Sequence, residues 1–132
     1  MSTVWTQLRL DIGTGSGLHP SKAAALARRI QPGWQNRAAC AGQEDPDLYF
    51  PAPRAPREQL APMLTVCAGC PVRRSCLAGG LLGCEYGIWG GTTEAERDEA
   101  LGRLRHGARV DEVLDQTLSA ASAEAAEGGQ AA

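Results

Sequence analysis

The spacing of its cysteines is the feature that most constrains this chain. Cys67, Cys70 and Cys76 fall within ten residues, and Cys40 lies far upstream of them. A CxxC pair at a helix end directs two sulfurs to one point, and Cys76, about a turn and a half into a following helix, can face the same point. Cys40 would then tie the N-terminal segment to this group. The pattern therefore predicts a site with four thiolate ligands.

Composition indicates why the fold would depend on such a site. The chain has 132 residues, but alanine inflates its 43% hydrophobic content, and aromatic residues make up only 5%. A core this thin usually needs a metal or disulfides. The first eighteen residues lack the apolar region of a signal peptide, and no segment approaches the roughly 20 apolar residues of a membrane span. We expect a cytoplasmic protein without membrane association, where a CxxC is more often a metal or redox site than a structural disulfide.

The four thiolates suit an iron–sulfur cluster and a tetrahedral zinc ion alike. Structural zinc sites usually pair two short CxxC or CxxH units, whereas one CxxC with a nearby third cysteine and a distant fourth is commoner for clusters. Spacing therefore favours a cluster over zinc, and both over a chance grouping of buried thiols. We interpret the fifth cysteine, Cys84, as a small packed residue. The alternative is a resolving thiol that acts after cluster loss.

The rest of the sequence predicts a small all-α fold with four to five short helices around the cluster and flexible termini. The segments expected are a flexible extension with a short helix (1–33), a cluster-binding core (34–93), C-terminal helices with possible DNA contact (94–118) and a disordered tail (119–132). Proline positions, a Thr93–Glu96 capping box and apolar periodicity predict helices at 21–30, 62–67, 71–83, 94–105 and 110–118.

Glycines interrupt this pattern at two places. Gly79 and Gly80 each cost the 71–83 helix about 1 kcal/mol relative to alanine, which predicts a bent or frayed second half. The run GIWGG at 87–91 cannot be helical and is expected to form a tight turn that presents Trp89. Trp89 is either an exposed anchor for a partner protein or a core residue that shields the cluster, and these roles are compatible.

Five motifs occur together in a specific order: WQNRAAC at 34–40, YFP at 49–51, CAGCPVRRSCL at 67–77, GIWGG at 87–91 and TTEAER at 92–97. With them, the chain resembles the WhiB-like proteins of actinobacteria. The resemblance implies a cytoplasmic transcription regulator that holds a [4Fe–4S] cluster on Cys40, Cys67, Cys70 and Cys76 and responds to oxygen or nitric oxide. It also implies docking on the C-terminal domain of the principal sigma factor through Gly87, Ile88, Trp89, Gly90 and Gly91.

Contact with promoter DNA is a further possibility, because family members that bind DNA carry a basic C-terminal tail or hook. Here the candidates are Arg103, Arg105 and Arg109, which form either a phosphate-contacting patch or a solvated helix end. Residues 105–118 could also be half of a helix-turn-helix motif. Its second helix, however, carries Asp111, Glu112 and Asp115 where a reader of the major groove needs basic or amide side chains.

An enzymatic role is the main alternative to regulation. The apo-protein could reduce disulfides through Cys67 and Cys70, cycling through a disulfide of its own, if Arg73, Arg74 and the following helix N-terminus lowered a thiol pKa. No strand-helix-strand pattern of a thioredoxin-like fold precedes the CxxC, and no set of catalytic residues is offered. We therefore expect a monomeric regulator without enzymatic activity.

Overall fold

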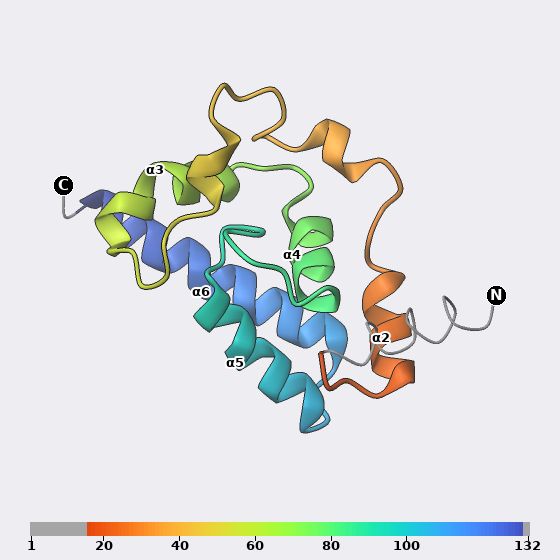
Figure 1. The fold of residues 1–132 in the computed structure, drawn as a ribbon. Helices are drawn as coiled ribbons and strands as arrows, with labels where there is room; N and C mark the ends of the chain where they lie inside the picture. The colour runs from red at the N-terminus through yellow and green to blue at the C-terminus, as the bar shows by residue number, and fades with distance from the viewer. Residues whose placement is uncertain (1–15, 131–132) are drawn as a thin grey trace.

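The computed structural model describes residues 16–130, and its regular secondary structure over that range is helical, apart from one isolated bridge between Trp89 and Thr92 (Figure 1). Residues 1–15 of the predicted flexible extension and residues 131–132 of the predicted disordered tail lie outside the described residues. Two single 3₁₀ turns span Trp34–Arg37 and Pro46–Tyr49. The five α-helices in this range are α2 (Pro20–Ala27), α3 (Arg57–Ala68), α4 (Arg73–Leu82), α5 (Glu94–Arg105) and α6 (Val110–Gln130). The predicted small all-helical class is confirmed.

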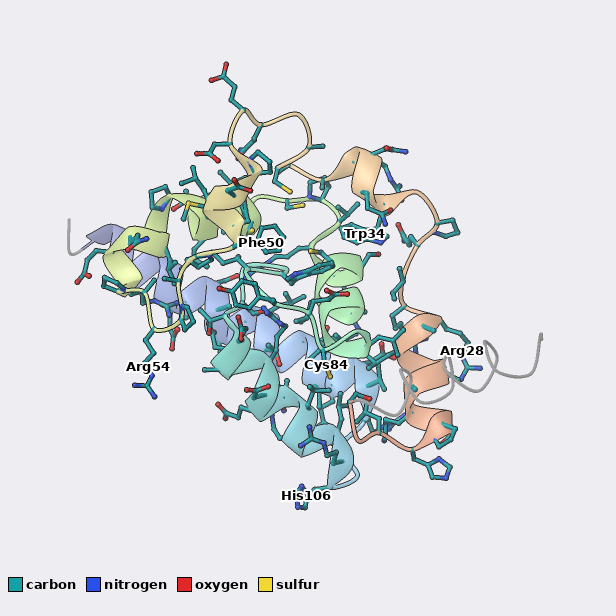
Figure 2. All side chains as sticks on the ribbon, viewed as in Figure 1. Arg28, Trp34, Phe50, Arg54, Cys84 and His106 are labelled. Atoms are coloured by element: carbon teal, nitrogen blue, oxygen red, sulfur yellow. The ribbon has the colours of Figure 1, made fainter. Side chains whose placement is uncertain are left out.

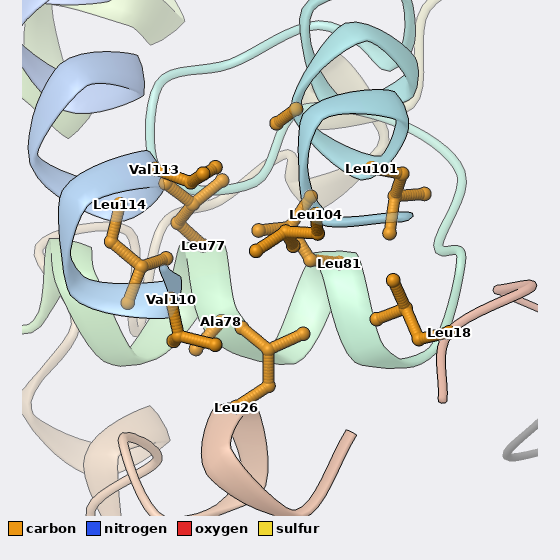
Figure 3. Packing of buried hydrophobic residues seen from close by; sticks show 11 residues of the cluster. Leu18, Leu26, Leu77, Ala78, Leu81, Leu101, Leu104, Val110, Val113 and Leu114 are labelled. Carbon is orange, nitrogen blue, oxygen red and sulfur yellow. The ribbon is translucent and has the colours of Figure 1, made fainter. Parts of the chain in front are cut away.

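The main core is built around α4, which lies between α2, α5 and α6 (Figure 3). Leu77, Ala78 and Leu81 of α4 are fully buried at helical spacing. The helix runs through Gly79 and Gly80 to Leu82 without the predicted fraying. A Cβ atom on Gly80 would lie 2.8 Å from the Cβ of Trp89, so this glycine allows the turn at 87–91 to approach α4.

A second, smaller core lies under α3 and contains Tyr49, Leu60, Met63, Leu64, Cys67 and Ile88. Helix α3 begins at Arg57, five residues before the predicted start, so Pro62 lies inside it. Proline removes one helical hydrogen bond at that point. The burial of Leu60, Met63 and Leu64 on one face outweighs this loss, because apolar burial stabilises by roughly 1.5–3 kcal/mol per large side chain.

Helix α6 corrects the prediction of a disordered tail from residue 119. The helix continues to Gln130, and its second half runs beside α3 (Figure 1). Alanine-rich sequence favours the helical backbone. Tertiary contacts hold it: Ala121 is buried, Glu124 pairs with Arg57 at 2.7 Å, and Arg73 donates to the hydroxyl of Ser122.

The predicted ends of α5 are confirmed. The side chain of Thr93 accepts a hydrogen bond from the Glu96 amide, and the Glu96 carboxylate accepts one from the Thr93 amide, which completes the capping box. Gly107, at φ +101°, follows the helix and turns the chain into α6. Among the described residues, no helix combines the length and apolarity needed to cross a bilayer.

Candidate metal centre

All four cysteines predicted as ligands line one cavity of about 220 Å³. Cys40 follows the first 3₁₀ turn, Cys67 lies in the last turn of α3, Cys70 in the α3–α4 loop and Cys76 in the first turn of α4. The fold therefore brings the distant Cys40 to the three clustered cysteines. The remaining wall is largely apolar and aromatic, with Trp34, Tyr49, Phe50, Val66, Ile88 and Trp89 among its residues.

The four thiols differ in their exposure. Cys67 is buried, Cys70 and Cys76 are half-buried, and Cys40 is exposed. Burial raises the pKa of Cys67 to about 11 and that of Cys76 to about 12, with smaller contributions from the neighbouring cysteines. In the metal-free protein these two sulfurs are therefore protonated thiols at neutral pH.

Backbone amides point at three of the four sulfurs. Gly90 donates to the Sγ of Cys76 at 3.2 Å, and Ala39 donates to the Sγ of Cys70 at 3.4 Å. A backbone hydrogen bond from Gly91 reaches Cys67 and opposes the rise of its pKa. These donors favour the thiolate forms of the cysteines, which are the forms that bind metals.

The turn at 87–91, the GIWGG turn, supplies two of these donors and forms one wall of the cavity. Gly90 has φ +62°, and a Cβ atom there would lie 2.9 Å from both the Arg73 carbonyl oxygen and the Leu77 Cβ. Four of the five turn residues, proposed from the sequence as a docking surface, are buried; only Trp89 is partly exposed. Trp89 packs against Trp34 with ring centroids 6.2 Å apart and donates its Nε1–H to the Tyr86 carbonyl at 2.9 Å.

The cysteines surround a space and do not converge on one point. Within residues 16–130, no three cysteine, histidine or acidic side chains lie close enough together to hold a single metal ion. Four cysteines that line one cavity, with amide donors beside them, are nonetheless a ligand set that could hold a soft metal.

Comparison with known proteins shows the family to which these residues belong. The family described as "Transcription factor WhiB" matches residues 34–100, which contain all four cysteines and the GIWGG turn. This chain belongs to the WhiB family. The transcriptional regulator WhiD of Streptomyces coelicolor is 42% identical over 105 residues, covering 75% of this chain and 83% of WhiD. WhiB2 of Mycobacterium tuberculosis is 43% identical over 65 residues, covering 48% of this chain and 68% of WhiB2. No solved structure matches the chain.

Two arginines of this WhiB-family protein hold the GIWGG turn, and sequence reasoning missed both roles. Arg73 lines the cavity and donates through Nε to the Gly90 carbonyl at 2.8 Å. Arg97 is 2% exposed and donates to backbone oxygens on both sides of the turn. A signal for Arg97 was present, because it stands three, four and seven residues before Ala100, Leu101 and Leu104, on the buried face of α5.

Cys84 lies at the opposite end of α4 from Trp34 and does not line the cysteine cavity (Figure 2). Its prediction as a packed residue is wrong, since the side chain is exposed. The physical reason is local: α4 ends at Leu82, and Cys84 adopts φ +48° in the turn that follows. Cys84 is thus separate from the other four cysteines, as predicted, but faces solvent.

The three arginines predicted as DNA contacts differ in exposure and in their hydrogen-bond partners. Arg103 is half-buried and donates to Gln116 Oε1 at 2.6 Å and Thr117 Oγ1 at 3.0 Å. Arg105 is exposed and donates to the Ser16 carbonyl, and Arg109 is exposed at the start of α6. Helix α6 buries Val113 and Leu114 and exposes acidic residues, so it presents no basic recognition face.

Proposed function

We propose that this WhiB-family protein is a cytoplasmic, redox- or nitric-oxide-responsive transcription regulator that holds a [4Fe–4S] cluster. The observation that carries the proposal is the single cavity lined by Cys40, Cys67, Cys70 and Cys76. Once bound, the cluster would supply a centre whose integrity depends on oxidants, as cysteine-ligated clusters react at exposed iron and sulfur atoms.

The shape of the site favours a cluster over zinc. Four thiolates on one zinc ion lie within about 4 Å of one another, because Zn–S bonds are about 2.3 Å long. In a cubane, each thiolate binds a different iron, so the sulfurs stand around a volume. Cysteines arranged around a cavity of about 220 Å³ fit the second arrangement.

The protein's own residues would shield one side of the cluster from solvent and leave the other side exposed. Cys67 and Cys76 are covered by the GIWGG turn, and Trp34 and Trp89 keep water from that side. Cys40 is exposed and lies in a segment with little regular structure. An oxidant would therefore reach the site most easily at Cys40, and loss of this ligand would release the segment around it.

The partner we propose is the C-terminal domain of the principal sigma factor. Leu48, Phe50 and Tyr86 are exposed large apolar residues, at 51%, 50% and 45%, and Phe50 also lines the cysteine cavity. Phe50 stacks on Tyr86 with ring centroids 6.3 Å apart. Preorganised aromatic residues beside a functional site are typical of protein docking surfaces.

Arg105 and Arg109 would add contacts to DNA phosphates, whereas Arg103 is engaged within the fold.

The test is anaerobic purification followed by iron, sulfide and zinc analysis. We expect about four irons and four sulfides per chain. The Cys40→Ala variant should lose the visible absorbance of the cluster, and Cys84→Ala, the matched control, should keep it. One zinc per chain without sulfide would overturn the cluster. Co-purification with the sigma factor should be lost in Phe50→Ala and kept in Arg28→Ala, a variant on the surface of α2; equal retention would overturn the docking surface.

The reductase alternative is not favoured by the site. A disulfide reductase needs an accessible thiolate, but Cys67 is buried and its pKa is raised to about 11. Of the cations expected to lower that pKa, Arg73 lowers it by less than burial raises it, and its donors bind Gly90 and Ser122. Arg74 pairs with Asp111 and Asp115.

A further inference from the structure

The buried guanidinium of Arg97 lies behind the GIWGG turn. Its Nη1 donates to the Thr92 carbonyl at 2.6 Å and to the Thr92 hydroxyl at 3.1 Å. Its Nη2 donates to the carbonyls of Glu85, at 3.1 Å, and Gly87. Glu85 and Gly87 precede the tip of the turn and Thr92 follows it, so one side chain joins both ends of the turn.

Only arginine can make this set of contacts. The guanidinium presents five N–H donors in a rigid plane, whereas a lysine ammonium presents three on a flexible stem and cannot span carbonyls from two strands of a turn in the same way. The space is also tight, because a Cβ atom on Gly80 would lie 3.3 Å from Cδ of Arg97. Arg97 is thus fixed between α4, α5 and the turn.

The turn that Arg97 holds carries the amides aimed at the cysteines. Gly90 donates to Cys76 and Gly91 to Cys67, and Arg73 fixes the Gly90 carbonyl from the other side. The burial of a cation here is costly, since desolvation lowers the pKa of Arg97. Attraction to the Glu94 carboxylate offsets part of this cost, and a thiolate form of Cys76 would add to it, which places the cation within electrostatic reach of the cysteine site.

We propose that Arg97 is a positioning residue of the metal centre: by holding both ends of the GIWGG turn, it directs the Gly90 and Gly91 amides at the sulfurs and so sets the reduction potential of the cluster. This inference rests on the proposed function. Hydrogen bonds to cluster sulfurs stabilise the more negative, reduced state and thereby raise the potential. Removing the clamp should lower the potential.

The experiment compares Arg97→Lys and Arg97→Gln with Arg74→Gln, which removes an arginine of α4 that pairs on the surface with Asp111 and Asp115. Each anaerobically purified protein is first analysed for iron and sulfide. Redox titration followed by electron paramagnetic resonance then gives the potential. We expect both Arg97 variants to change the reduced-to-oxidised ratio at fixed potential at least tenfold, about 59 mV for a one-electron couple, and Arg74→Gln to match the wild type.

A second measurement distinguishes the effect of the amide positions from the effect of the positive charge at residue 97. Resonance Raman bands of the Fe–S bonds shift in D₂O when amides donate to the sulfurs, and this shift should shrink in Arg97→Lys although the charge is kept. The proposal would be overturned if Arg97→Lys kept the reduction potential and the D₂O shift of the wild type. It would also be overturned if Arg74→Gln changed them as much as the Arg97 variants do. If the Arg97 variants do not fold, Thr92→Val, which removes one acceptor of Arg97, replaces them. This variant should lower the reduction potential and shrink the D₂O shift, and a Thr92→Val protein with wild-type values of both would overturn the proposal. A wild-type protein without iron and sulfide would instead refute the proposed function.

Discussion

Gly90 meets two demands that other residues do not meet together. Its φ of +62° favours glycine, and its Cα faces the Arg73 carbonyl and Leu77 so closely that a Cβ atom would lie 2.9 Å from each. We predict that Gly90→Ala lowers the free energy of unfolding by about 2–4 kcal/mol, since backbone strain and overpacking each cost about 1–3 kcal/mol. Thermal and denaturant unfolding measure this.

The matched control for Gly90 is Gly102, which lies within α5 and has open space around its Cα. Gly102→Ala should raise the free energy of unfolding by about 0.5–1 kcal/mol through helix propensity. Equal stability of the two variants would contradict the tight fit of Gly90.

The buried thiols predict a pH dependence of the metal-free, reduced protein. The pKa of Cys67 is raised to about 11 and that of Cys76 to about 12, from an ordinary value of 9.0. A raised pKa in the folded state means that the folded protein holds these protons more tightly, so their contribution is complete below about pH 9 and declines as pH rises toward 11–12. Urea unfolding should therefore show stability falling between about pH 9 and pH 11. Cys84→Ala should leave the profile unchanged, and a flat profile would refute the burial of these two thiols.

The second half of α6 is a separate element whose order depends on docking against α3. Ala121 is 2% exposed, whereas Ala120, one residue before it, is exposed. We predict that Ala121→Glu reduces helical content and stability by about 2–3 kcal/mol, because a buried carboxylate without a partner is strongly unfavourable. Ala120→Glu should have little effect. Circular dichroism and amide exchange of residues 119–124 measure both, and equal effects would show that this half does not dock.

The observed helices show which parts of the fold could be predicted from the sequence. The ends of α5 follow local rules, a Thr93 capping box and Gly107, and were predicted correctly. The start of α3 and the length of α6 depend on packing between distant segments, so local rules started α3 five residues too late, at Pro62, and placed a disordered tail after residue 118. Only tertiary contacts make Ala121 a buried residue.

The candidate site likewise has features that follow from local sequence patterns and features that follow only from tertiary packing. The four cysteines and the glycine turn were found from motif spacing, and the structure brings them to one cavity. The clamp by Arg97 could not be predicted, because three of its four acceptors are backbone carbonyls, which every residue type carries. The exposure of Cys84 likewise follows from where α4 ends, which composition does not determine.

The whole molecule has two hydrophobic cores, which differ in how far they depend on the cysteine site. The larger core joins α2, α4, α5 and α6 and includes none of the cysteines. The smaller core under α3 includes Cys67 itself, with Tyr49 and Ile88 beside the cavity. Residues 34–56 contribute only two single 3₁₀ turns, and Tyr49 is their one buried residue. The order of this segment therefore depends on the cysteine site far more than the order of the helical bundle does.

This division predicts how loss of the cluster spreads through the molecule. Metal ligation would link Cys40 to α3 and α4, and its removal leaves residues 34–56 with few buried contacts and low local stability. We expect amide exchange on cluster removal to accelerate at least tenfold across residues 34–70, while the amides of Leu77, Leu81 and Leu104 keep their protection. Cys40→Ala should reproduce this pattern without an oxidant. Acceleration that extended equally to the bundle core would mean that the cluster stabilises the entire fold, and the signal would then be global unfolding instead of release of the face that carries Phe50.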